Sequence, residues 1–379
     1  MEIHDLKQRA EHRAEPINKI LTKSIPCHAI GVIFCEAEIL RSGKPKKMRN
    51  ISRIKQLTLT APITFGAWLF LCVFVVIGAE KRDYYPGKLG IEKAKSLTAA
   101  QRAVEARFAA YLESNTEAAI ARYLEKYANE INADNARELS ADYAPGGIDA
   151  EDEATRVART LWGEAVHEPA SALVKEIYRR ALAHDTPPNR RRQVLFTAGG
   201  AGVGKTTSIR RIAEFSDAVR LQVAEIVYDA TMATFGSAIG RIVQALDSGR
   251  MVSIVFVYRD PVVSFVDGML TRARETGRIV PLEVFLSTHL GAVETIVKIA
   301  AAFKNNPQVA IVIIDNRDGI SKARIADPSF AEAMARRYTR EELGAKLRLA
   351  LEEAYEKGRR GDQNGIPENI HREIKGYVQ

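Results

Sequence analysis

The sequence predicts an α/β protein in which a parallel β-sheet is covered by helices on both faces. Apolar runs of strand length occur near residues 194–198, 225–229, 252–258 and 309–314. Helical patterns separate the later runs, and apolar strands that alternate with helices are typical of parallel sheets buried on both sides. A third observation is the glycine-rich loop that joins the first strand to a helix. This loop locates the edge of the sheet where a ligand is expected.

The glycine-rich loop has the pattern G-x-x-x-x-G-K-T between Gly199 and Thr206. Glycines allow the backbone to turn its N–H groups around an anion, and the following helix adds the positive end of its dipole. In this pattern Lys205 reaches the outer phosphates of a nucleoside triphosphate, and the Thr206 hydroxyl binds Mg²⁺. We therefore expect ATP and Mg²⁺ at this loop. The expected nucleotide-binding residues are Gly199, Gly200, Ala201, Gly202, Val203, Gly204, Lys205, Thr206 and Thr207.

The positive charge of the chain is local. The 379 residues carry a formal net charge of +8, and seven basic residues without an acidic one lie between Arg41 and Lys55. The rest of the chain is close to neutral, so the composition does not indicate a nucleic-acid-binding surface. The three scattered cysteines, Cys27, Cys35 and Cys72, predict neither a disulfide framework nor a zinc site, and they fit a reducing compartment.

An apolar run of 23 residues without a charge extends from Leu57 to Ala79. It is long enough to span a bilayer, and it lacks the polar stripe of a soluble core helix. Read from Met48, the same run resembles a secretory signal, although Ile77–Gly78–Ala79 is a poor cleavage site. Basic residues flank the run on both sides and favour an inside N-terminus only slightly. The segment is therefore expected to be a membrane or signal segment, and its orientation stays open.

Helical patterns fill most of the remaining chain. Apolar residues recur at three and four positions between Ser96 and Asn129, where Ser114–Asn115–Thr116 predicts a division into two helices. Further helices are expected over 151–184, 237–248, 261–275, 281–303 and 329–357. The chain thus divides into a charged N-terminal region (1–56), the apolar segment (57–79), a helical region (80–130), a P-loop domain (131–325) and a C-terminal helical tail (326–379).

Carboxylates follow the predicted strands at the edge where parallel sheets bind ligands. Asp229 ends one strand, and Asp315 follows the apolar run 309–314. Asp315 resembles a Walker B carboxylate, which holds Mg²⁺ through water, and a turn or helix-cap role is the alternative. Asp260 directly precedes Pro261 and is expected to cap a helix.

Arginines near the site can neutralise the charge on a transferred phosphoryl group. Arg272, Arg274 and Arg278 cluster at the end of the helix expected over 261–275. A solvated helix end explains such a cluster equally well, because cations are favoured near a helix C-terminus. Arg278 lies beyond the expected stop at Gly277 and is therefore better placed to point inward.

Three stretches together resemble the zeta toxin family: TAGGAGVGKTT (197–207), IVYDATM (226–232) and YRDPVVSFVDGMLTRARETGRIVP (258–281). The resemblance extends over about residues 131–316. It implies a P-loop kinase-like fold and phosphorylation of a sugar hydroxyl of UDP-N-acetylglucosamine. Carried over by position, it implies that Lys205 is the Walker lysine, that Arg272 and Arg278 bind the transferred phosphate, and that Asp229 and Thr231 bind the substrate. The family usually has Glu where Asp229 stands and Gly where Ala230 stands.

The catalytic base departs from the family pattern. In the family an N-x-D-x-x-R segment follows the P-loop helix, whereas here a segment of this type precedes the P-loop strand, as Asn132–Ala133–Asp134–Asn135–Ala136–Arg137. We hypothesise a local permutation, in which this segment folds back over the site. Asp134 then accepts the proton of the sugar hydroxyl and Arg137 orients the substrate. An ordinary helix start with Asp134 as its cap is the alternative. His167 fits a packed helix residue equally well and is left out of the expected catalytic set.

The resemblance favours an ATP- and Mg²⁺-dependent kinase of a nucleotide sugar, with a cytoplasmic catalytic domain anchored to the inner membrane. The alternatives are a membrane-associated P-loop NTPase that acts as a switch without a small-molecule acceptor, and a kinase of another small molecule. The family also implies an antitoxin partner, and helices before residue 130 could shield the ATP site in its place. The expected site residues are Asp134, Lys205, Arg272 and Arg278 for catalysis, Asp229, Thr231 and Arg137 for the substrate, and Thr206 and Asp315 for the metal.

Overall fold

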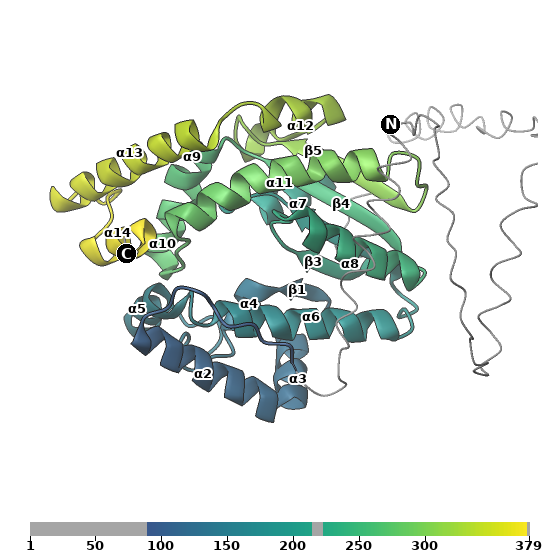
Figure 1. Ribbon diagram of the computed structural model, residues 1–379, viewed down its shortest axis with the longest axis horizontal. Coiled ribbons are helices and arrows are strands. Elements are labelled where there is room, and N and C mark those ends of the chain that lie inside the picture. The colour runs from purple at the N-terminus through teal and green to yellow at the C-terminus, as the bar shows by residue number, and fades with distance from the viewer. Residues whose placement is uncertain (1–88, 214–222, 377–379) are drawn as a thin grey trace, which may run out of the picture. The chain divides into compact units, whose positions relative to one another are not determined.

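The computed structural model describes residues 89–213 and 223–376. It centres on a six-stranded sheet in the order β1-β3-β2-β4-β5-β6 (Figure 1). Neighbouring strands are parallel except for β5 and β6, which are antiparallel. The strands are β1 (Glu130–Asn132), β2 (Arg191–Ala198), β3 (Ala224–Asp229), β4 (Met251–Tyr258), β5 (Val309–Asp315) and β6 (Arg324–Ala326). The predicted α/β class with a mainly parallel sheet is confirmed.

Helices surround this sheet on both sides. Before the P-loop strand they are α2 (Ala99–Ser114), α3 (Thr116–Tyr127), α4 (Ala133–Arg137), α5 (Glu153–Trp162) and α6 (His167–Ala183). After it they are α7 (Lys205–Ala213), α8 (Phe235–Asp247), α9 (Pro261–Val263), the π-helix η2 (Ser264–Leu270), α10 (Thr271–Thr276), α11 (Leu282–Ala302), the 3₁₀-helix η3 (Ile320–Lys322), α12 (Pro328–Ala335), α13 (Arg340–Arg359) and α14 (Glu368–Lys375).

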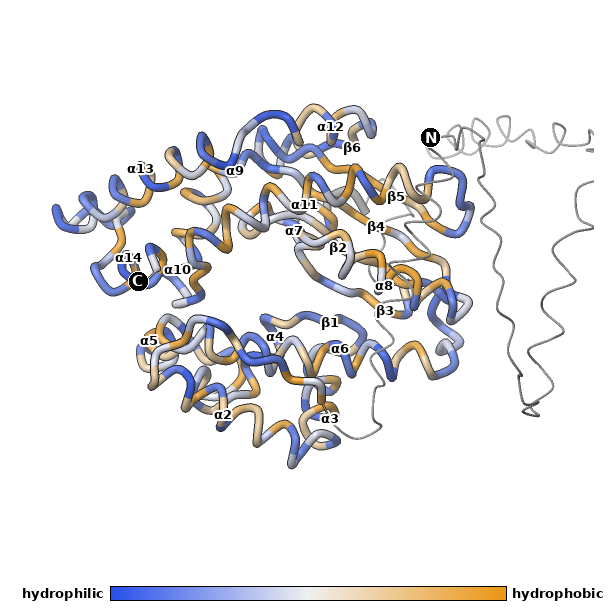
Figure 2. Tube along the Cα trace, viewed as in Figure 1, coloured by the Kyte–Doolittle hydropathy of each residue, from blue (hydrophilic) through white to orange (hydrophobic). Residues whose placement is uncertain are grey.

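Alternate residues of the central strands face opposite layers of helices. Val194 and Phe196 of β2 share a core with residues of α6, α8 and α11, whereas Leu195 between them shares a core with Ile209 of α7. Successive side chains of a strand point to opposite faces, so both faces of β2 are buried. Figure 2 shows apolar residues concentrated in β4, β5 and α11. Each large apolar side chain buried in this way contributes roughly 1.5–3 kcal/mol to stability.

The helical region before the sheet is a pair of helices, divided at Asn115 as the sequence predicts. A capping box between Thr98 and Gln101 fixes the start of α2. Helix α2 packs on α5 and α6, and α3 packs on α6. In α3 the fully buried Tyr123 directs its hydroxyl at strand β1, where it accepts from Asn132 N at 2.8 Å and lies 3.0 Å from Glu130 O. The pair therefore supports the strand that leads into α4.

Strand β1 is not expected from the sequence. It has three residues, too few for an apolar period to be visible, and it forms only because β3 offers a parallel partner. Asn132 of β1 lies opposite Asp229 of β3 in the register. This pairing brings a segment that precedes the P-loop strand to the carboxyl edge of the sheet.

Two later regions differ from the expected helices. The helix expected over 261–275 contains the π-helix η2 between α9 and α10, and π-helices are short, often functional irregularities. The helical stretch expected over 329–357 consists of two helices, α12 and α13, because Thr339 starts a new capping box with Glu342. Helices α13 and α14 share a buried apolar cluster with η2, α10 and α11. The tail therefore packs on the segment that carries the site arginines.

Helix α11 is the one helix in the described ranges that is long and apolar enough to cross a membrane. It packs against α8, α12 and α13, and nine of its residues are buried, so we interpret it as a core helix. The apolar run 57–79, for which a membrane or signal role is expected, lies outside the described residues.

A buried ion pair joins the end of α6 to the sheet, and its removal is expected to destabilise the protein. Arg250 is 2% exposed and bonds both carboxylate oxygens of Glu225 and the backbone oxygen of His184 at 2.7 Å. The substitution Arg250→Ala leaves the Glu225 carboxylate buried without its partner. We expect the free energy of unfolding in urea to fall by about 3–5 kcal/mol. The exposed Arg122→Ala serves as the control and should stay within about 0.5 kcal/mol; a loss below that value in Arg250→Ala would contradict this account of the ion pair.

Candidate functional site

The P-loop lies between the end of β2 and the start of α7 and is held by contacts from three sides. Gly199 adopts a φ of +126°, and a Cβ there would lie 2.4 Å from Val257 O. Its N–H donates to Thr231 O at 3.1 Å. On another side, Asn316 Nδ2 donates to Val203 O at 2.7 Å. Backbone torsions and packing therefore both require glycine at the start of the loop.

His289 of α11 forms the third support of the P-loop. Its Nε2 lies 2.8 Å from Ala201 O, a contact that requires the proton on Nε2 because a carbonyl oxygen only accepts. Burial lowers the pKa of His289 to about 4, so the ring is neutral at physiological pH. The ring packs against Phe285 and leaves no space for a side chain at Gly200.

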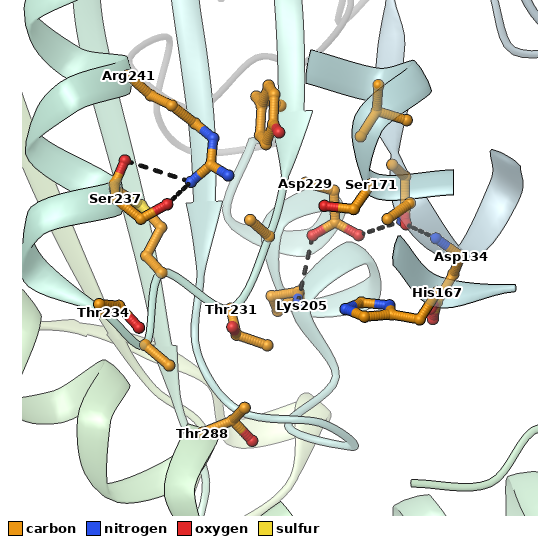
Figure 3. Close-up of a pocket in the computed structure, with 17 residues that line it drawn as sticks. Asp134, His167, Ser171, Lys205, Asp229, Thr231, Thr234, Ser237, Arg241 and Thr288 are labelled. Carbon is orange, nitrogen blue, oxygen red and sulfur yellow. Dashed lines mark hydrogen bonds and ion pairs between the residues drawn. The ribbon is translucent and has the colours of Figure 1, made fainter. Parts of the chain in front are cut away.

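A cavity of about 340 Å³ opens beside Lys205. Four expected site residues line it, namely Asp134, Lys205, Asp229 and Thr231. They come from α4, α7, the end of β3 and the loop that follows β3. Figure 3 shows the Asp229 carboxylate pointing toward Lys205 from one side, with Asp134 close by. Segments on both sides of the P-loop strand therefore share one cavity.

The side chain of Asp229, at the end of β3, bonds residues at the ends of β1 and β2 and lies beside the P-loop lysine. Lys205 Nζ lies 3.4 Å from Asp229 Oδ1. Asp229 Oδ2 accepts from Asn132 Nδ2 at 2.6 Å, and Oδ1 accepts from the Thr197 hydroxyl. These contacts place the carboxylate where it can bind a metal ion at the phosphates or accept a hydrogen bond from a substrate.

Asp134 faces the cavity and does not cap its own helix. The side chain of Asn132 caps α4 by accepting from Asp134 N at 2.8 Å, which leaves the Asp134 carboxylate free for other partners. Arg272 Nη2 lies 2.7 Å from Asp134 Oδ2, and Arg137 Nη1 lies 3.4 Å from Oδ1. Burial alone would raise the pKa of Asp134, but the charges of Arg137, Arg272 and Arg278 outweigh it and hold this pKa far below its ordinary value.

Four arginines converge on two carboxylates, that of Asp134 in α4 and that of Glu138 directly after the helix. Arg159 Nη2 and Arg278 Nη2 lie 2.7 and 2.5 Å from the fully buried Glu138 carboxylate. Together with Arg137 and Arg272 on Asp134, the cluster has more guanidinium groups than carboxylates. The buried Nε atoms of Arg137, Arg159 and Arg278 have no hydrogen-bond partner in the described part of the chain. Excess positive charge and unused donors suit an added anion such as a phosphate.

His167 is a site residue that the sequence analysis left out. It lines the cavity, and its Nδ1 lies 2.6 Å from Arg137 Nη2. A guanidinium only donates, so Nδ1 accepts and the ring proton is on Nε2. Although His167 as a whole is exposed, desolvation of its ring by the surrounding protein, followed by the charge of Arg137, lowers its pKa to about 4. Because Arg137 lies thirty positions away in the chain, no local pattern reveals this contact.

Asp315 is placed differently from the Walker B expectation. Arg317 Nε lies 2.9 Å from Oδ1, and Arg324 Nη2 lies 2.7 Å from Oδ2, so guanidinium groups bond both oxygens. Arg324 is present because β6 pairs antiparallel with β5, which the sequence analysis did not predict. Asp315 also does not line the cavity, and Asp229 is the carboxylate beside Lys205. The geometry therefore does not support the expected metal role of Asp315.

The residues near the P-loop fit a phosphate-bound Mg²⁺ better than a metal held by protein alone. The described ranges contain no group of three or more His, Cys, Asp or Glu side chains that could hold a metal ion. Thr206 and Thr207 are exposed at the start of α7. Mg²⁺ is usually held by one or two protein oxygens together with substrate phosphates and water. The Thr206 hydroxyl and the Asp229 carboxylate are oxygens of this kind.

The helices before residue 130 do not shield this cavity in the described part of the chain. Their residues are absent from its lining, and α2 and α3 pack instead on α5 and α6. The described helices therefore support β1 and α4. No contact of these helices with the cavity supports the expectation that they shield the ATP site.

A side chain at Gly200 is expected to weaken nucleotide binding. In Gly200→Ala the added Cβ would lie 2.4 Å from the His289 ring, which packs against Phe285. Overpacking of this kind costs about 1–3 kcal/mol. A loop that must undo this distortion to bind the phosphates should bind ATP about five- to hundredfold more weakly, as measured by calorimetry. Gly240→Ala, where nothing lies within 4 Å of the added atom, is the control. Unchanged ATP affinity in Gly200→Ala would show that this contact does not hold the loop.

The two neutral histidines predict a pH dependence of stability. The pKa values of His167 and His289 are about 4 in the folded protein and about 6.5 in an unfolded chain. Their contribution is fully present above pH 6.5 and is lost as the pH falls toward 4, because only the unfolded chain binds protons there. NMR titration should give midpoints near 4, with His167→Gln and His289→Gln used to assign the signals. A midpoint near 6.5 for His289 would contradict the burial of its ring, and a midpoint near 6.5 for His167 would contradict the effect of its surroundings and of Arg137 on that ring.

The comparison with protein families agrees with part of the sequence resemblance. The family model described as Zeta toxin matches residues 213–324. This match contains Asp229 and both expected phosphate arginines, begins after the P-loop, and is shorter than the expected span of 131–316. No curated protein matches the chain significantly. The zeta toxin resemblance is therefore confirmed for residues 213–324, and this family implies a P-loop kinase-like phosphotransferase.

Proposed function

We propose that the protein transfers the γ-phosphoryl group of ATP to a hydroxyl of a nucleotide sugar, with UDP-N-acetylglucosamine as the acceptor that the family resemblance suggests. One observation carries this proposal. The Walker lysine Lys205 and the candidate base Asp134 line the same cavity, and Arg272 contacts that base. A nucleotide-binding switch without an acceptor has no need of a carboxylate and an arginine at this position.

The proposed step needs an acceptor hydroxyl between Asp134 and the γ-phosphate. The hydroxyl oxygen forms a bond to the γ-phosphorus while the bond between that phosphorus and the ADP oxygen breaks. The hydroxyl proton passes to Asp134, and ADP leaves with the bridging oxygen and its electron pair. Lys205, Arg272 and Arg278 neutralise charge on the phosphate oxygens, and Arg137 orients the acceptor.

Binding of ATP changes the partners of the base in this proposal. Arg272 contacts Asp134 in the ligand-free structure, and this contact makes the carboxylate a weak proton acceptor. A γ-phosphate competes for Arg272 because it carries more negative charge than one carboxylate. Asp134 then loses one stabilising cation, so its pKa rises toward a value that suits a general base.

Mg²⁺ supplies charge neutralisation between the outer phosphates when it is bound. We propose that the Thr206 hydroxyl and the Asp229 carboxylate would hold this ion together with the phosphates. Asp315 is not given this role, because two positively charged guanidinium groups, those of Arg317 and Arg324, bond its carboxylate and disfavour a cation there.

The acceptor can be tested directly with the purified protein. Incubation with ATP, Mg²⁺ and a panel of nucleotide sugars, nucleosides and free sugars, followed by mass spectrometry, should yield a nucleotide sugar heavier by one phosphoryl group. A labelled nucleoside would instead indicate a kinase of another small molecule. Loss of ATP without any labelled acceptor would favour the NTPase switch and contradict the proposal.

Replacement of the base is expected to slow the transfer while leaving nucleotide binding intact. Asp134→Asn keeps the size of the side chain and removes the proton acceptor, so kcat should fall about 100-fold or more. The Kd for ATP should not rise, since Lys205 and the loop glycines are untouched and Arg272 is released from the carboxylate.

Asp142→Asn is the matched control. Asp142 also pairs with an arginine, Arg107, and its side chain is 31% exposed compared with 33% for Asp134. Near-normal turnover of Asp134→Asn, with ATP bound as tightly as in the unaltered protein, would remove Asp134 as the base.

A further inference from the structure

One end of the cavity carries a guanidinium group that the proposed transfer does not use. Arg241 lines the cavity from α8. Figure 3 places it on the side opposite Asp134, with Asp229 and Lys205 in the region between them. The cavity lining also includes the hydroxyl-bearing side chains of Ser171 and Thr231. The cavity therefore has a cation at the end away from the candidate base.

Arg241 is held in position by contacts with three side chains. Its Nη1 donates to Ser237 Oγ at 2.8 Å and lies 3.3 Å from the Ser237 backbone oxygen. Its guanidinium carbon lies 5.0 Å from the centre of the buried Tyr228 ring, within the range of a cation–π interaction. The Tyr178 hydroxyl donates to Arg241 O at 2.9 Å. These contacts fix both the backbone and the guanidinium group of Arg241.

The contacts of Arg241 leave part of its donor capacity unused. Within residues 89–213 and 223–376, no ion pair to a carboxylate is recorded for Arg241, whereas Arg272 and Arg278 each face one. Among the described residues only Nη1 makes hydrogen bonds, so within that part of the chain Nε and Nη2 remain as donors. Adjacent donors of a guanidinium match the oxygens of a phosphate in a bidentate arrangement.

We propose that Arg241 binds a phosphate group of the acceptor and so determines which sugars are phosphorylated. This inference rests on the proposed transfer. An acceptor whose phosphate lies at Arg241 extends its sugar past the hydroxyl-bearing lining toward Asp134. The substrate class is therefore a sugar that carries a phosphate, either as a sugar phosphate or as a nucleotide diphosphate sugar. A neutral sugar lacks the group that Arg241 recognises.

The test compares acceptors that differ in charge. Transfer from ATP is measured for UDP-N-acetylglucosamine, N-acetylglucosamine 1-phosphate and N-acetylglucosamine, with the unaltered protein, Arg241→Gln and Arg241→Lys. We expect Arg241→Gln to raise the KM of the charged acceptors about ten- to hundredfold, because a hydrogen-bonded charge is lost. Arg241→Lys should recover part of this loss, since it keeps the charge without the planar donors. The neutral sugar should be a poor acceptor for every variant.

Several outcomes separate this inference from the function on which it rests. If the protein phosphorylates a charged acceptor and Arg241→Gln leaves its KM unchanged, the inference is overturned while the transfer stands. The same holds if Arg241→Gln slows charged and neutral acceptors by one common factor. If no acceptor is phosphorylated by the unaltered protein, both proposals fall. Thermal unfolding confirms that each variant is folded, and Arg122→Gln on the exposed side of α3 controls for the loss of an arginine.

The relative activities with the two charged acceptors distinguish the source of the phosphate. Equal KM values indicate that a single sugar-linked phosphate is sufficient for Arg241. A lower KM for the nucleotide sugar, lost in Arg241→Gln, indicates that the diphosphate is the group bound. Both results support the inference.

Discussion

The ion pairs on helix α4 are the interaction on which the arrangement of the site depends. Asp134 and Glu138 lie one turn apart and bond arginines from α5, from α10 and from the loop after α10. Ion pairs at an exposed surface contribute little, but Glu138 is fully buried, and a buried ion pair is strongly destabilised when one partner is removed. The cluster therefore keeps the base-bearing segment next to the arginines expected to bind phosphate.

Parallel pairing of strands explains how a segment early in the chain reaches a site built by later segments. Strand β1 adds to the edge of β3, and β3 in turn pairs with β2, so the carboxyl end of β1 lies one strand away from the point where the P-loop begins. The Tyr123 hydroxyl supports β1 through hydrogen bonds with the backbone of Glu130 and Asn132. A base that precedes the P-loop in sequence can thus occupy the same cavity as Lys205. This placement agrees with the hypothesis of a local permutation.

The sequence predicts the parts of the site that depend on local chemistry and misses those that depend on distant pairing. The P-loop follows from its glycines and lysine, and the strands follow from their apolar runs. One partner of Asp315, Arg324, depends on β6, a three-residue strand without an apolar pattern, so this contact could not be foreseen. The other partner, Arg317, lies only two residues along the chain. The contact of His167 with Arg137, which sets the tautomer of the ring, joins residues that lie thirty positions apart in the chain. The division of the tail into two helices was visible in principle, since Thr339 and Glu342 form a capping box.

In the proposed transfer Lys205 binds the phosphate of ATP and Asp134 takes the proton of the acceptor hydroxyl. Arg272 leaves the Asp134 carboxylate and binds the γ-phosphate instead. A crystal structure with Mg²⁺ and a non-hydrolysable ATP analogue tests this most directly. The account predicts that the γ-phosphate lies within hydrogen-bond distance of both Lys205 and Arg272, and that the Asp134 carboxylate faces the cavity without Arg272. A γ-phosphate out of reach of Arg272, with the Arg272–Asp134 ion pair intact, would contradict the account.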